Sequence, residues 1–177
     1  MRSIRRSKET ISVDIMEFTH AGGNRLGLVF YGIKSKRIAY HGLGYKESTT
    51  HSNLDDLVQF MYEKGIPRQL VMDSHSILGT GNLWKRVLGM TFTPLFLSEP
   101  YKHNQNLVGK SIQGIQSGVS KIMNACGVGV MAYKCDMWEY ICDVNKYVAW
   151  DSLDNSLPYE VFWGETPDIS IICFKFW

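Results

Sequence analysis

Residues 98–112 of this chain read SEPYKHNQNLVGKSI. The stretch predicts the end of a strand, a polar turn that carries Pro100, and then the start of a helix. After the turn, apolar side chains recur every three or four residues, the spacing of one buried helical stripe: Val108, Ile112, Ile115, Val119 and Ile122. The turn therefore joins a strand to a long helix with one buried face.

The composition is that of a soluble globular domain. The 177 residues are 45% hydrophobic and 20% charged, and the net charge of +2 is too small to indicate a nucleic-acid partner by itself. Basic residues crowd the first eight positions, so we expect residues 1–9 to form a basic tail that is either solvated or in contact with phosphate. No linker or repeat interrupts residues 10–177, which we expect to form a single domain.

The cysteines and the hydropathy of the sequence indicate the cellular compartment in which we expect the protein. The four cysteines form no CxxC pair, so they are expected to be small core residues in a reducing compartment. The sequence shows no signal peptide and no apolar run of transmembrane length. We therefore expect an intracellular protein without a membrane segment, not a secreted one, with the nucleus as a candidate location.

The identities of the residues in the quoted turn are more informative than their hydrophobic periodicity. The turn resembles the integrase catalytic cores of retroviruses and Copia-like retrotransposons, where a run that contains EPY, a histidine, QN and then AE places the last catalytic glutamate on a helix. Six residues match this run: Glu99, Pro100, Tyr101, His103, Gln105 and Asn106. The position of the glutamate itself is occupied by Gly109. The C-terminal segment GETPDISIICFKFW also resembles the closing segment of Copia-type integrase domains, so the resemblance covers nearly the whole chain.

The order of predicted elements agrees with the fold that this resemblance implies. Three antiparallel strands (10–18, 24–33 and 37–43) precede a helix at 51–64 and a strand at 68–73. A short helix (82–87), a strand (90–97), the long helix to about 123, and further helices within 126–150 and 158–164 follow. This is an α/β order, and it predicts a ribonuclease-H-like mixed five-stranded sheet flanked by helices.

The resemblance implies a two-metal site for DNA integration. Cutting or joining a phosphodiester requires an activated nucleophile and charge stabilisation, which two divalent ions roughly 3.5–4 Å apart supply when carboxylates hold them. The resemblance maps the two metal-binding aspartates onto Asp14, in VDIMEF, and Asp73, in LVMDS, with Mg²⁺ or Mn²⁺ as the cofactor. Residues 74–108 separate Asp73 from Gly109, and this is the spacing that the family shows before its glutamate. Because glycine offers no ligand, we expect the second ion to be weakened most and catalysis to be impaired.

Other residues have both a functional and a structural interpretation. His103, Gln105, Asn106 and Lys110 are candidates for DNA contact, and the alternatives are a packed turn for the first three and a solvated helix face for Lys110. Glu99 is a weaker candidate for a substitute third ligand. Gly109, Gly114 and Gly118 lie inside the long helix, where each glycine costs roughly 1 kcal/mol relative to alanine, as relaxed selection would allow.

Four hypotheses therefore stay open. The first is a Copia-like integrase core with impaired catalysis, which has DNA as its partner and forms homo-oligomers. The second is an active enzyme with an unconventional third ligand such as Glu99. The third is a non-catalytic module that binds DNA or another partner through the retained surface, and the fourth is a pseudogene product that makes no stable protein.

Overall fold

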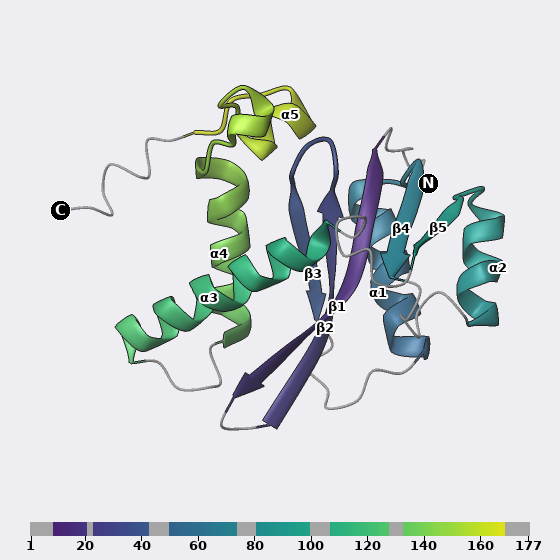
Figure 1. Cartoon of the computed structure of the whole chain (residues 1–177), viewed down its shortest axis with the longest axis horizontal. Helices are drawn as coiled ribbons and strands as arrows, with labels where there is room; N and C mark the ends of the chain where they lie inside the picture. The colour runs from purple at the N-terminus through teal and green to yellow at the C-terminus, as the bar shows by residue number, and fades with distance from the viewer. Residues whose placement is uncertain are drawn as a thin grey trace.

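A mixed five-stranded sheet forms the centre of the protein (Figure 1). The computed structural model describes six stretches of the chain, residues 9–20, 23–42, 50–73, 81–99, 107–127 and 133–168. The strands are β1 (Thr10–His20), β2 (Gly23–Gly32), β3 (Ile38–Gly42), β4 (Gln69–Asp73) and β5 (Leu95–Ser98). They lie in the order β3-β2-β1-β4-β5, antiparallel among the first three and parallel from β1 to β5. The expected ribonuclease-H-like architecture is confirmed.

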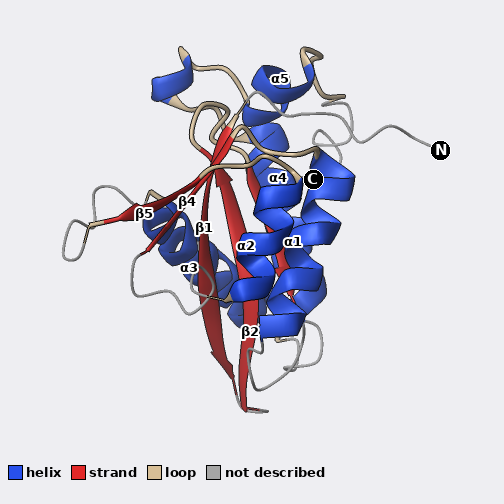
Figure 2. Ribbon diagram, turned by 90° about the vertical axis from the view of Figure 1, so that its right-hand side faces the viewer, coloured by secondary structure: helices blue, strands red, loops and turns tan. Residues whose placement is uncertain are grey.

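Helices cover both faces of the sheet. They are α1 (Thr50–Lys64), α2 (Asn82–Met90), α3 (Val108–Cys126), α4 (Tyr133–Tyr147) and α5 (Pro158–Trp163). Figure 2 shows α1 and α2 in front of the sheet and α3 behind it. Among the described helices, none combines the length and the apolarity that a membrane crossing requires.

Each face of the sheet has its own hydrophobic core. Alternate strand residues such as Val13, Phe30 and Met72 pack with α1 and α2, where Trp84 is fully buried. The intervening residues, including Met16 and Val29, pack with α3 and α4 on the opposite face. This division follows from the period-two alternation of a strand, so each strand residue can be assigned to a face by its neighbours.

The expected strand at 90–97 is wrong at its start. Helix α2 continues to Met90, and the Thr91 hydroxyl ends it by donating to the carbonyls of Val87 and Leu88, at 3.0 and 3.2 Å. Phe92 then adopts a left-handed backbone conformation (φ 51°), and β5 begins only at Leu95, after Pro94. The boundary between α2 and β5 is hard to predict from the sequence, because the end of the helix, the turn and the strand all contain large hydrophobic residues.

Glu9 and Gly164 lie close to the two ends of the described part of the chain. Residues 1–8 lie outside the described residues, but Glu9, the last residue of the expected tail, is buried and accepts hydrogen bonds from the Ser35 backbone and hydroxyl. Near the other end, Gly164 has a left-handed conformation (φ 75°) and ends α5, as the sequence predicts.

Candidate active site

Asp14 lies on β1, on the sheet face that α3 and α4 cover. Its neighbours Val13 and Ile15 pack with α1 and α2, so strand alternation turns Asp14 to the opposite face together with Met16. The side chain is half-buried, and its Oδ1 accepts the backbone N–H of Ile15 at 2.8 Å. The carboxylate thus lies near the middle of β1, between the apolar residues Val13 and Ile15.

Asp73 ends β4 on the same face, at the register position next to Asp14. The parallel ladder pairs Thr10 with Gln69 and continues to the pair of Val13 with Met72, so the next step places Asp14 beside Asp73. Met72 packs with α1 and α2, which turns Asp73 towards the α3 face. Paired strands lie about 4.8 Å apart, a separation at which two carboxylates can contact one ion.

Gly109 lies in the first turn of α3, the helix that covers this face. The helix contacts β1 and β2, and its buried stripe includes Val108, Ile115 and Val119. Gln116 ties it to β1 by donating from Nε2 to the carbonyl of Glu17 at 2.6 Å. Among the described residues, a Cβ added at Gly109 would meet no atom within 4 Å apart from its chain neighbours and the α3 backbone, so these residues leave room for a longer side chain.

Asp14 and Asp73 are two carboxylates, the hard oxygen ligands that suit a divalent cation such as Mg²⁺. Within the described stretches, no group of three or more His, Cys, Asp or Glu side chains could hold a metal ion. Two carboxylates with water in the remaining positions are nevertheless a usual way for a protein to bind Mg²⁺. Asp14 and Asp73 are the residues that would supply these two carboxylates.

Of the other residues that the sequence suggested for the site, some lie outside the described residues and two can be located. His103, Gln105 and Asn106 lie outside the described residues, so their expected contact with DNA stays a prediction. Lys110 is exposed in the first turn of α3, where a phosphate could reach it. Glu99 is exposed directly after Ser98, and alternation along an extended chain would turn it away from the face that holds Asp73.

Sequence reasoning missed Ser98. It pairs with Asp73 in the parallel ladder between β4 and β5, and its side chain is buried. Asp14, Asp73 and Ser98 therefore form a polar row across three adjacent strands. The only sequence signal was the position of Ser98 at the start of the quoted turn, because the register that aligns the row is a tertiary property.

Comparisons by sequence and by structure give different results. No protein-family model matches the chain, and no curated protein matches it either. Among solved structures, the HTLV-2 integrase catalytic core domain in complex with magnesium superimposes with a TM-score of 0.73 at 10% identity, covering 91% of this chain and 99% of that one.

Two further structures agree. The catalytic core domain of BIV integrase gives a TM-score of 0.68 at 12% identity, over 89% of this chain and 95% of that one. The simian T-cell lymphotropic virus intasome in complex with PP2A regulatory subunit B56 gamma gives 0.76 at 11% identity, over 96% of this chain and 58% of that one. The protein therefore has the fold of retroviral integrase catalytic cores.

Proposed function

We propose that this protein is a Copia-like retrotransposon integrase core that binds DNA and is impaired in strand transfer. One relationship carries the proposal: Asp14 and Asp73 lie at neighbouring register positions of one sheet face, under the helix whose first turn holds Gly109. In this proposal the protein acts inside the cell on DNA, and copies of it associate, as the dimeric and trimeric forms of the HTLV-2 core do.

The chemistry of the proposed site follows from its ligands. Bound divalent ions supply an activated nucleophile and stabilise charge on the phosphorus and the leaving oxygen. Asp14 and Asp73 would hold the first ion, with the sheet fixing the separation of their carboxylates. Gly109 leaves the second ion without its protein ligand, so stabilisation of the leaving group is the part of the reaction that we expect to fail.

The exposed lysines of α3 support the proposal that the protein binds DNA without cleaving it. Lys110 and Lys121 on α3 are both exposed, and their ammonium groups can pair with backbone phosphates. Such contacts make affinity fall with salt, with a slope of about −0.9 per phosphate neutralised on double-stranded DNA. A Lys110→Gln variant should weaken binding to all sequences alike and reduce this slope by about one.

Metal-dependent nicking of supercoiled plasmid tests the proposal. The natural chain should stay near background, while Gly109→Glu should gain nicking in Mg²⁺ or Mn²⁺. Gly109→Gln is the matched control, because it raises helix propensity to a similar degree without supplying a carboxylate. Adding Asp14→Asn to Gly109→Glu should abolish the gain. Robust nicking by the natural chain, or equal nicking by the Glu and Gln variants, would refute the proposed role of position 109.

A further inference from the structure

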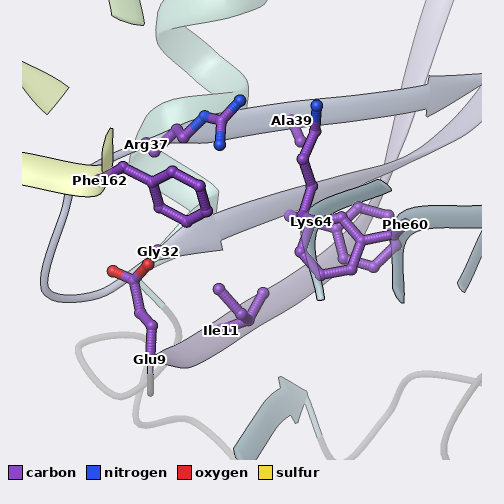
Figure 3. Close-up of a pocket in the computed structure, with 9 residues that line it drawn as sticks. Glu9, Ile11, Gly32, Arg37, Ala39, Phe60, Lys64 and Phe162 are labelled. Carbon is purple, nitrogen blue, oxygen red and sulfur yellow. The ribbon is translucent and has the colours of Figure 1, made fainter. Parts of the chain in front are cut away.

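The two edges of the central sheet differ in how they are covered. At the β3 edge, α4 packs on the strand, and Arg37, directly before β3, lies against Phe162 of α5, with 4.2 Å between the guanidinium carbon and the ring centroid (Figure 3). At the other edge, β5 has β4 as its one neighbour in the sheet, and Figure 2 shows it at the left-hand edge of the molecule. Within the described stretches, no backbone hydrogen bond reaches the outer side of β5. This edge is therefore open to a further strand.

The parallel ladder fixes which backbone groups of β5 face outwards. The Leu70 N–H donates to the Pro94 carbonyl at 3.0 Å, and the register pairs Leu70 with Leu95. Alternate residues of a strand direct both backbone groups to the same neighbour, so Phe96 bonds to β4 while Leu95 and Leu97 direct their N–H and carbonyl groups away from it. Two N–H groups and two carbonyls thus line the outer edge.

The side chains of this edge are apolar and partly exposed. Phe96 is 45% exposed and Leu97 is 42% exposed. Leu95 packs with the core beneath α1 and α2, so alternation turns Leu97 to the same face and Phe96 to the face of α3. The strand contains no charged residue. An uncharged apolar edge with unpaired backbone groups is a template for pairing with another strand.

We propose that β5 pairs with β5 of a second copy of this chain, antiparallel about a two-fold axis at Phe96. In this register Leu95 lies opposite the partner's Leu97, and each such pair exchanges two hydrogen bonds, so all the outward groups are satisfied. Phe96 lies opposite the partner's Phe96 as a non-hydrogen-bonded pair, the kind in which side chains approach most closely. The contact joins the two sheets into one.

Charge complementarity at the strand ends favours a second copy as the occupant. The register of β4 and β5, continued past its start, places Arg68 beside Thr93. In the proposed pairing Glu99 lies opposite the partner's Thr93, so the partner's Arg68 is one strand further, at a Cα separation of about 10 Å. Both side chains are exposed, and alternation places both on the face of α1 and α2.

Long side chains can span this separation, and a carboxylate accepts further donors beside those that it already has. The two-fold axis repeats the ion pair, so each copy contributes one Glu99 and one Arg68. An unrelated acidic or basic strand would complement only one of these charges. The inference rests on the association of copies that the proposed function includes, and it identifies the surface. With four residues of β5 from each copy, the contact is small, so we expect a dissociation constant of about 10–100 µM.

Sedimentation equilibrium of the full chain, at concentrations on both sides of this constant, tests the inference. The natural chain should fit a monomer–dimer equilibrium. Leu97→Pro removes an outward N–H and no bond to β4, so it should weaken the dimer about tenfold or more while the fold is retained. Phe96→Lys places two like charges opposite each other and should have the same effect. Tyr62→Lys, at an exposed position of α1, is the control and should leave the dimer unchanged.

A charge exchange tests the register. Glu99→Arg and Arg68→Glu should each weaken the dimer about threefold, and the double variant should regain the natural affinity. A monomer throughout the range, undiminished association of both Leu97→Pro and Phe96→Lys, loss of the dimer in Tyr62→Lys, or no recovery in the double variant would overturn the inference. The substituted positions lie outside the proposed metal site, so nicking by Gly109→Glu tests the proposed chemistry separately from the dimer.

Discussion

The side-chain amide of Asn145 pairs with both backbone polar groups of Ile38. Its Oδ1 accepts the Ile38 N–H at 2.8 Å, and its Nδ2 donates to the Ile38 carbonyl at 2.7 Å. Strand β3 is at the edge of the sheet, and Asn145 of α4 is buried against it. The amide therefore occupies the place of a further strand at this point of the edge, and it fixes α4 to the sheet.

Replacing this amide should be costly. We expect Asn145→Ala to lower the free energy of unfolding by about 2 kcal/mol, because two hydrogen bonds are lost and buried backbone groups are left unpaired. Asn124→Ala, at an exposed position of α3, should change it by less than about 0.5 kcal/mol. Urea denaturation of both variants measures the difference, and equal midpoints would contradict a structural role for Asn145.

Two glycines of α3 should respond to alanine in opposite ways. A Cβ at Gly114 meets no atom within 4 Å in the described part of the chain outside the α3 backbone, so Gly114→Ala should stabilise the protein by up to about 1 kcal/mol through helix propensity. A Cβ at Gly118 would overlap the Tyr140 ring of α4, so Gly118→Ala should cost about 1–2 kcal/mol from overpacking. Thermal unfolding gives both values. A stabilised Gly118→Ala would show that the Tyr140 ring moves away at little cost.

The stability of the protein should depend on pH through His41. The ring is buried edge-on to Phe30 and Phe60, with centroid separations of 5.7 and 6.2 Å. Burial lowers the pKa of His41, Lys64 lowers it further, and Glu63, with Oε2 3.9 Å from Nε2, opposes the shift. Below the ordinary pKa of about 6.5, the unfolded chain takes up the proton first, so the free energy of unfolding falls as the solution is acidified.

A matched variant isolates this titration from that of the carboxylates. His41→Phe keeps an aromatic ring and removes the titrating group, so the stability of the natural chain relative to His41→Phe should decrease from pH 7 towards pH 5. Chemical denaturation across this range provides the comparison. Parallel plots of unfolding free energy against pH for the two proteins would contradict a pKa of His41 lowered by burial. A gain in relative stability of the natural chain in acid would contradict it as well.

Divalent metal should stabilise the natural chain weakly. A site of two carboxylates with a dissociation constant near 1 mM would raise the free energy of unfolding by less than about 1 kcal/mol in millimolar Mg²⁺. Asp14→Asn and Asp73→Asn should lose the metal-induced rise in melting temperature, and Gly109→Glu should enlarge it. Asp55→Asn, an exposed position on α1, controls for net charge. A rise that persists in both aspartate variants would place the metal elsewhere.

The order of the elements could be predicted because it depends on local patterns. The alternation in β1, the helical stripe of α3 and the stop at Gly164 are properties of neighbouring residues, so they can be identified without knowing the fold. The start of β5 was predicted wrongly because the threonines and large hydrophobic residues of MTFTPLFL suit a strand, although the chain turns at Thr91 and β5 begins only after Pro94. The close packing of Gly118 could not be predicted either, since it depends on the ring of Tyr140, which lies 22 residues further along the chain.

The sequence by itself determined which groups are available: two aspartates at strand positions, and a glycine where the resemblance expects a carboxylate. Only the tertiary structure decided which of these groups meet. The register of β1 against β4 places Asp14 beside Asp73, and the pairing of β4 with β5 adds Ser98 to the row. Packing of α5 against the start of β3 likewise brings Arg37 beside Phe162. The physical reason is that register and helix packing are set by burying side chains distant in the sequence, and no local pattern encodes those partners.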